Sequence, residues 1–82
     1  MRDPKRISEL IELIKEIWEK DPDLRFQQLI YNLQRGYSQQ NNDIGKVESN
    51  EEDGFTKIGY DLFNTEDDKF IEYLHKKIDN EL

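Results

Sequence analysis

Apolar residues recur every three or four positions along the start of the chain and predict an amphipathic helix over residues 4–20. Asp3 and Pro4 favour a helix start, because an Asp side chain can accept hydrogen bonds from free N–H groups and proline has no N–H to leave unpaired. Leu13 falls outside the apolar stripe. The stripe has the spacing of a helix that turns one face to a core and consists of Ile7, Leu10, Ile11, Ile14, Ile17 and Trp18.

A second apolar stripe follows the turn at Asp21-Pro22-Asp23 and predicts a second helix over residues 24–35. Pro22 disfavours helical backbone at the residue before it, which ends the first helix. Gly36 is expected to end the second helix, because glycine readily takes the left-handed conformation of a helix terminus. The turn is short, so the two helices should pack as neighbours. The second stripe consists of Phe26, Leu29, Ile30, Leu33 and Tyr37.

Residues 37–54 have almost no apolar content and no period, which predicts a long mobile loop. Residues 55–60 could extend as a strand that lays apolar side chains on the core. A single strand has no partner, so we expect no sheet in this region.

The last apolar stripe predicts a third helix over residues 66–80. Thr65 is a suitable cap, and Asp68 three residues later can return the hydrogen bond. The sequence therefore predicts an all-α fold, a small three-helix domain spanning residues 1–82 with the 37–54 loop between the second and third helices. Its expected core consists of Ile11, Ile14, Trp18, Phe26, Leu29, Ile30, Leu33, Phe63, Phe70, Ile71 and Leu74.

Composition limits the chemistry and the location of the chain. A chain of 82 residues without cysteine has room for one domain and has no disulfide, thiolate metal site or thiol nucleophile. Its start lacks the apolar run of a signal peptide and no stretch is apolar enough to span a membrane, so we expect a cytoplasmic protein. The net charge of −7 lies wholly after position 42, and a negative field repels nucleic acid and favours basic partners.

No motif in the sequence brings together residues for catalysis or metal binding. His75 is the only histidine, and without a Cys or Ser nucleophile it gives no catalytic triad. Adjacent acids such as Glu51-Glu52 and Asp67-Asp68 do not converge on one substrate, and solvation and helix capping explain them better. We therefore expect no enzyme activity, no cofactor and no bound metal.

Three stretches of the sequence share their pattern with a known group of proteins. They are Arg2-Asp3-Pro4 with Arg6-Ile7, Pro22-Asp23-Leu24-Arg25 with Gln28-Leu29-Ile30, and Asp61-Leu62-Phe63 with Glu66-Asp67-Asp68. Together they resemble small uncharacterised proteins of Gram-positive bacteria and their phages and prophages. The resemblance covers the first two predicted helices and the start of the third. It implies a bacterial or prophage origin and carries no activity across to this chain.

The function expected from these features is that of a non-catalytic interaction protein, a monomer or weak homodimer that binds another protein. One alternative is a regulator of helix-turn-helix outline that reads nucleic acid with the outward face of the second helix. That face carries only two cations, too few for useful affinity for phosphates, so nucleic acid is the less favoured partner. The face consists of Arg25, Gln28, Tyr31, Asn32 and Arg35.

A further alternative uses the acidic half of the chain. Its carboxylates could imitate phosphates and inhibit a basic host protein by binding its surface. The residues that would do so lie at the start of the third helix, Glu66, Asp67 and Asp68, and in the predicted loop at Glu51, Glu52 and Asp53.

Overall fold

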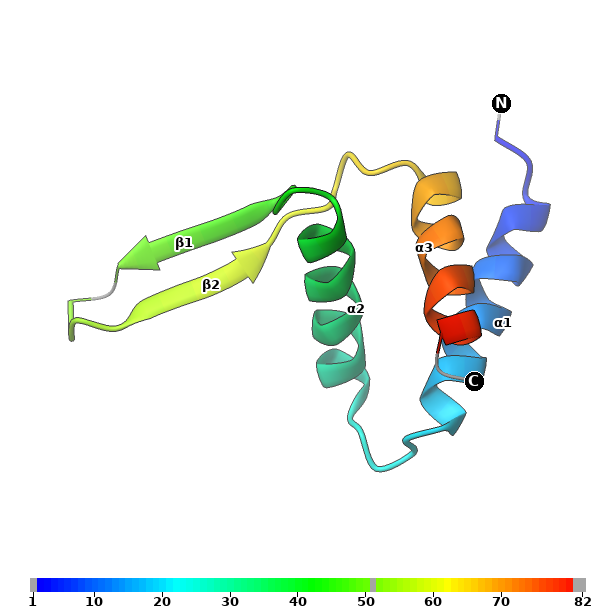
Figure 1. The fold of residues 1–82 in the computed structure, drawn as a ribbon, viewed down its shortest axis with the longest axis horizontal. Helices are drawn as coiled ribbons and strands as arrows, with labels where there is room; N and C mark the ends of the chain where they lie inside the picture. The colour runs from blue at the N-terminus through cyan, green and yellow to red at the C-terminus, as the bar shows by residue number, and fades with distance from the viewer. Residues whose placement is uncertain (1, 51, 81–82) are drawn as a thin grey trace. The chain divides into compact units, whose positions relative to one another are not determined.

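The computed structural model describes residues 2–50 and 52–80, which form three helices and one β-hairpin (Figure 1). The chain divides into two compact units. The terminal unit comprises Met1–Phe26 and Thr65–Leu82, and the central unit comprises Gln27–Asn64. The elements follow in the order α1 (Lys5–Glu19), α2 (Phe26–Gln40), β1 (Lys46–Asn50), β2 (Thr56–Tyr60) and α3 (Asp67–Asn80).

In the terminal unit, α1 and α3 pack on each other and run in the same direction (Figure 1). Ion pairs join the beginnings of the two helices. Arg6 Nε lies 2.7 Å from Asp67 Oδ2, and Arg2 Nη2 donates to both carboxylate oxygens of Glu66 at 3.0 and 3.1 Å. The buried apolar side chains of this unit come from both helices and are Leu13, Ile17, Ile71, Tyr73, Leu74 and Ile78.

The buried face of α1 differs from the one that the sequence predicts. Leu13, expected outside the apolar stripe, is 7% exposed, whereas Ile11, expected in the core, is 58% exposed. The two residues lie on opposite sides of the helix, because an α-helix turns by about 100° per residue. Ile14 and Trp18 are half-buried, and Phe26, another expected core residue, is exposed. The core face of α1 is therefore rotated away from the centre of the predicted stripe.

In the central unit, α2 continues beyond Gly36, where the sequence predicts its end. The additional turn buries Tyr37 and Ser38, and the Ser38 hydroxyl donates a 2.7 Å hydrogen bond to a backbone carbonyl in the following turn. Asn42 and Asp43 take the left-handed conformation after the helix, with φ angles of 61° and 59°. Their short polar side chains make this conformation accessible to them. The burial of the last turn thus overrides the tendency of Gly36 to end the helix.

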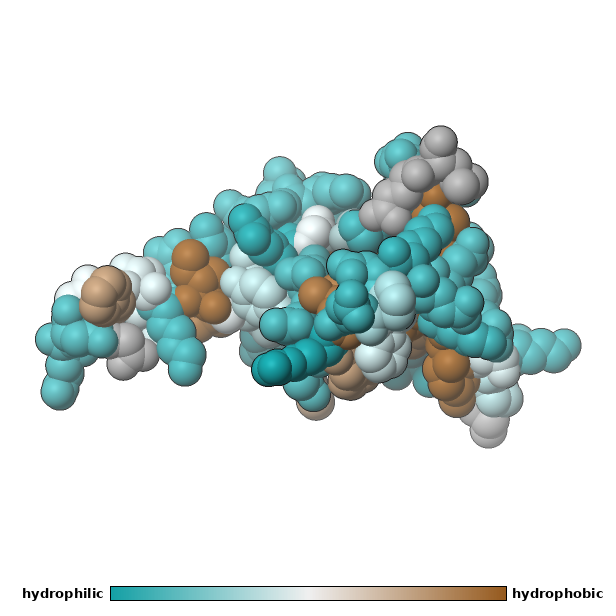
Figure 2. Space-filling model, turned by 90° about the horizontal axis from the view of Figure 1, so that it is seen from below, coloured by the Kyte–Doolittle hydropathy of each residue, from teal (hydrophilic) through white to brown (hydrophobic). Residues whose placement is uncertain are grey.

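The strands β1 and β2 form an antiparallel hairpin, with Lys46 opposite Tyr60 and Asn50 opposite Thr56. The bend between them contains Gly54, whose φ of 88° suits glycine. All of β1 and the first three residues of β2 are exposed. Apolar side chains are visible on the hairpin as brown atoms at the left of Figure 2. The hairpin therefore forms with little apolar burial of its own.

These elements contradict the all-α prediction and its mobile loop over residues 37–54. The end of α2 and the whole of β1 lie in that range, and β1 supplies the partner strand that the segment 55–60 lacked in the prediction. Only Val47 is apolar in β1, and a strand exposed on both faces shows no alternation of apolar and polar residues. Phe63, expected to fold back over the core, is 91% exposed.

Gly45 lies at the base of the hairpin, where the chain leaves α2 and returns from β2. Its carbonyl accepts a 2.7 Å hydrogen bond from the backbone N–H of Asp61, and its φ is 75°. A β-carbon at this position would collide with the Asp61 carbonyl oxygen and with the Leu62 side chain. Only glycine fits this crossing without displacing the backbone.

We expect Gly45→Ala to loosen the hairpin, because the left-handed conformation alone costs an alanine about 1–2 kcal/mol and the collision adds to it. Gly59→Ala is the matched control, since a β-carbon there meets no atom within 4 Å. Amide hydrogen exchange of β1 and β2 measures the effect. Equal protection of the strands in both variants would show that the base of the hairpin tolerates a side chain.

We expect Leu13→Ala to lower the free energy of unfolding by about 2–5 kcal/mol, the usual cost of truncating a buried leucine. Ile11→Ala on the opposite side of the same helix should change it by about 0.5 kcal/mol or less, as exposed substitutions do. Urea denaturation followed by circular dichroism provides the comparison. A larger loss of unfolding free energy for Ile11→Ala than for Leu13→Ala would show that α1 buries the face that the sequence predicts.

Candidate protein-interaction surface

α1 is apolar on two sides, and α3 covers only one of them. Leu13 and Ile17 are buried, while Ile7 and Ile11 remain about half exposed. Ile11 and Ile17 differ by about a third of a turn around the helix axis at 3.6 residues per turn. A surface helix normally has one apolar stripe about 100° wide. α1 therefore has more apolar surface than a helix that packs against a single neighbour requires.

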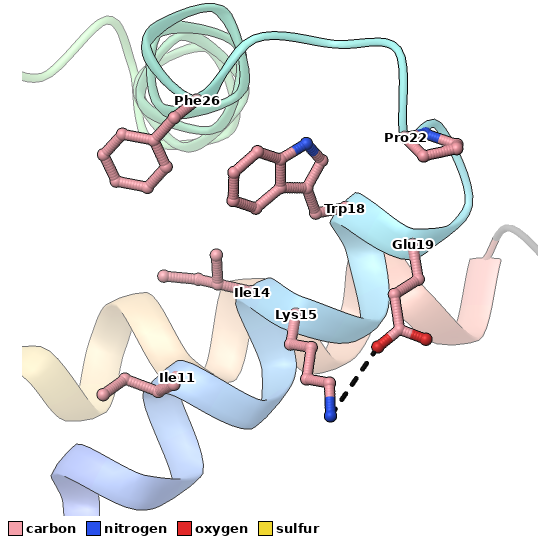
Figure 3. A pocket seen from close by; sticks show the side chains of 7 residues that line it. All are labelled: Ile11, Ile14, Lys15, Trp18, Glu19, Pro22 and Phe26. Atoms are coloured by element: carbon pink, nitrogen blue, oxygen red, sulfur yellow. Dashed lines mark ion pairs between the residues drawn. The ribbon is translucent and has the colours of Figure 1, made fainter.

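This second side forms part of an open hollow in the terminal unit, which we call the α1 groove (Figure 3). Its volume is about 530 Å³, within the range of ligand-binding clefts. In Figure 3, the apolar side chains of α1 point toward the same space as the Phe26 ring. The groove is lined by Ile11, Ile14, Lys15, Trp18, Glu19, Pro22 and Phe26.

Trp18 fixes one end of the α1 groove. Its Nε1–H donates a 2.8 Å hydrogen bond to the carbonyl of Leu24, across the turn that follows α1. Its ring lies 5.6 Å from that of Phe26 between centroids, tilted by 44°. The Asp21 N–H also donates to the Trp18 carbonyl at 3.0 Å, which holds the beginning of the turn. Aromatic walls held in this way change little on binding, which lowers the entropy cost of association.

Beyond Lys15 and Glu19, which form the charged edge of the groove, α1 turns into a side rich in carboxylates. We call this side the acidic flank: Glu9, Glu12, Glu16 and Glu19, with Lys15 among them. Lys15 pairs with Glu19 at 3.8 Å, at the edge of the groove. Glu9 Oε1 lies 3.0 Å from His75 Nε2. Glu12 and Glu16 have no ion pair among the described residues. The acidic flank itself lines a smaller hollow of about 270 Å³.

The residues predicted to read nucleic acid are all exposed: Arg25, Gln28, Tyr31, Asn32 and Arg35. The last four lie on one face of α2, at the spacing of successive helical turns. Arg25 precedes α2 and belongs to the terminal unit. The Tyr31 ring already has a partner, because it meets the ring of Tyr60 at 5.6 Å in an edge-on contact.

Four of the six acidic residues predicted to imitate phosphates have partners within the chain. Glu66 and Asp67 bind Arg2 and Arg6, as described above, and Asp68 Oδ1 accepts a 2.9 Å hydrogen bond from the N–H of Lys69. In the hairpin bend, Asp53 Oδ1 accepts from the N–H of Phe55 at 3.1 Å. Glu52 is exposed, and Glu51 lies outside the described residues. The four partnered carboxylates therefore already take part in interactions within the fold, and the phosphate-imitating role stays a prediction.

Other chemistry finds no support in the described parts of the chain. No group of three acidic, His or Cys side chains in residues 2–50 and 52–80 could hold a metal ion. Over the same residues, none of the helices has the length and apolar character needed to cross a bilayer. The carboxylate of Glu48, hydrogen-bonded to Lys46 in β1, raises the pKa of that lysine. This pair is exposed, belongs to the central unit and lines neither of the two hollows.

Comparisons of the chain with models of protein families, with curated proteins and with solved structures find no match. The resemblance to small proteins of Gram-positive bacteria and their phages therefore stays a prediction.

We expect Trp18→Phe to lower the free energy of unfolding by about 0.5–1.5 kcal/mol, because it removes the hydrogen bond to Leu24 and keeps an aromatic ring in place. Phe26→Leu is the control, since it removes the ring contact and leaves that hydrogen bond intact. Urea denaturation followed by circular dichroism at 222 nm suits both variants. An unchanged urea midpoint for Trp18→Phe would show that the hydrogen bond to Leu24 does not stabilise the turn.

Proposed function

We propose that this chain is a non-catalytic interaction protein that binds another protein through the α1 groove. The proposal includes the cytoplasmic location and the bacterial or prophage origin that the sequence predicts. The observation that best supports this proposal is the second apolar side of α1, where Ile11 is exposed beside the half-buried Trp18. Apolar surface of this kind, bordered by charged side chains, is typical of protein-binding sites.

The composition of the α1 groove supports the same proposal. Trp is among the residues that contribute most to binding energy at interfaces, especially near the centre of a contact. Trp18 is held by its hydrogen bond to Leu24 and by the Phe26 ring, so a partner would meet a preformed surface. A small-molecule role is less well supported, because few polar groups converge on the groove to orient a ligand.

Nucleic-acid binding remains the weaker alternative. The predicted reading face offers Arg25 and Arg35 as its only cations, on a chain of net charge −7. Each phosphate contact needs a cation to release counterions, so two cations give little affinity at physiological salt. Nucleic-acid binding by this face would give no role to the exposed apolar side of α1.

Affinity capture from a lysate of the native host tests the proposal with the wild type, Ile11→Asp and Val47→Asp. Both substitutions place a charge on an exposed apolar residue, but Val47 lies on the hairpin. We expect wild type and Val47→Asp to retain the same partner, and Ile11→Asp to lose it by at least about tenfold in affinity, because a charge in an apolar contact is left without a partner. Circular dichroism confirms that each variant is folded. Retention by all three proteins would rule out the α1 groove as the binding site.

A further inference from the structure

The bend of the hairpin contains the only aspartate or asparagine of the sequence that is followed by glycine, Asp53-Gly54. In such a pair the peptide nitrogen after the aspartate has no neighbouring side chain to hinder its approach to the side-chain carboxyl group. Both residues are exposed, and a β-carbon at Gly54 would meet no atom within 4 Å. The bend therefore leaves room for the aspartate side chain to close a ring with the backbone.

The Asp53 side chain is already folded back along its own backbone. Its Oδ1 accepts a 3.1 Å hydrogen bond from the N–H of Phe55, two residues further on. This arrangement, an Asx turn, keeps the carboxyl group beside the backbone of the residue in between, which is Gly54. The φ of 88° at Gly54 lies in the left-handed region, which glycine enters without strain. The fold thus holds the carboxyl group near the nitrogen that would attack it.

The same chain contains a matched comparison at Asp61. Its Oδ1 also accepts a 3.1 Å hydrogen bond from the N–H two residues further on, which again belongs to a phenylalanine, Phe63. Asp61 is exposed as well. The residue in between is Leu62 instead of glycine, and its side chain crowds the peptide nitrogen. The Asp61 N–H also donates to the Gly45 carbonyl, which holds this aspartate at the base of the hairpin.

We propose that Asp53-Gly54 is a site of spontaneous backbone modification, at which aspartate converts to isoaspartate in the folded protein. In the first step, the Gly54 nitrogen bonds to the side-chain carboxyl carbon of Asp53, and the amide proton leaves with the carboxyl hydroxyl as water. In the second step, water opens the resulting succinimide. Attack at the side-chain carbonyl restores aspartate, whereas attack at the main-chain carbonyl leaves the backbone running through the former side chain. Water is the only co-reactant, and nothing is oxidised or reduced.

The product changes the bend that joins β1 and β2. Isoaspartate adds a methylene carbon to the backbone, and the carboxylate that binds the Phe55 N–H becomes part of a peptide bond. The ladder closes beside this bend, where Asn50 lies opposite Thr56 and their side chains are hydrogen-bonded at 3.2 Å. Because the strands bury little, we expect the modification to loosen this end of the hairpin.

Incubation of the full chain at neutral pH, followed by digestion with trypsin, tests the proposal. Cleavage after Lys46 and Lys57 releases residues 47–57, which contain the site. Mass spectrometry with electron-transfer fragmentation assigns isoaspartate to single residues, against a sample taken before incubation. We expect at least about tenfold more isoaspartate at Asp53 than at Asp61, because glycine has no side chain to hinder ring closure. In water labelled with heavy oxygen, Asp53 should take up the label, since each ring opening consumes a water molecule.

Two variants at Asp53 are matched to the wild type. Asp53→Asn keeps a pair that suits a hairpin bend and reaches the same succinimide by loss of ammonia, so we expect isoaspartate to form faster than in the wild type. Asp53→Glu keeps the charge, but its longer side chain closes a larger and less favourable ring. We expect no isomer at this position above the level of the unincubated sample. Circular dichroism confirms that both variants are folded.

Equal isoaspartate at Asp53 and Asp61 would overturn the proposal. A folded chain that forms none at Asp53, while the isolated peptide of residues 47–57 does, would also overturn it, because the fold would then protect the pair. Uptake of the oxygen label at Asp53 in the wild type and in Asp53→Asn, with no isomer in Asp53→Glu, is the result that supports it.

Discussion

The terminal unit depends on the apolar packing of α1, which has apolar side chains on two sides and buries only one of them. On one side, Leu13 and Ile17 are buried where α1 packs on α3, a helix about 60 residues later in the sequence. The side that contains Ile11 has only the Trp18 and Phe26 rings at one end. Burying apolar area is worth about 25 cal/mol per Å², so the chain forgoes stability by leaving this side open. Binding a partner is one way in which that surface can be covered.

The sequence predicts the helices well where apolar period and end signals agree. Asp3 lies one residue before the N-cap Pro4, and its Oδ1 accepts a 2.9 Å hydrogen bond from the N–H of Lys5, the first residue of α1. The stripe of α2 already includes Tyr37, one residue beyond Gly36, and this was a sign that the helix continues. In α1, the predicted apolar stripe leaves out Leu13. A stripe that includes Leu13 is wider than the surface that one neighbouring helix can bury. The groove was therefore present in the pattern but was assigned to the core.

The hairpin could be predicted only in part, for a physical reason. Its strands are largely exposed, so burial does not select an alternating pattern, and β1 reads as a polar loop. The Asp53-Gly54 pair was the available signal, since Asp-Gly between two extended segments is typical of a hairpin bend. The collision that excludes a side chain at Gly45 depends on the returning chain at Asp61, which no local pattern specifies. Likewise, the ion pairs of Glu66 and Asp67 depend on partners more than sixty residues away in sequence.

The pairing of Arg6 with Asp67, 61 residues apart, also has a consequence for how the protein is made. A ribosome releases α1 before α3, so α1 leaves the exit tunnel with both of its apolar sides unpaired. It stays so until α3, about 60 residues later in the sequence, has also emerged, while α2 and the hairpin, whose contacts are local, can already form. Chains emerge at about 5–20 residues per second, which leaves α1 exposed for several seconds. The helix that we propose as a binding surface is thus also the one whose apolar side chains stay exposed longest during synthesis.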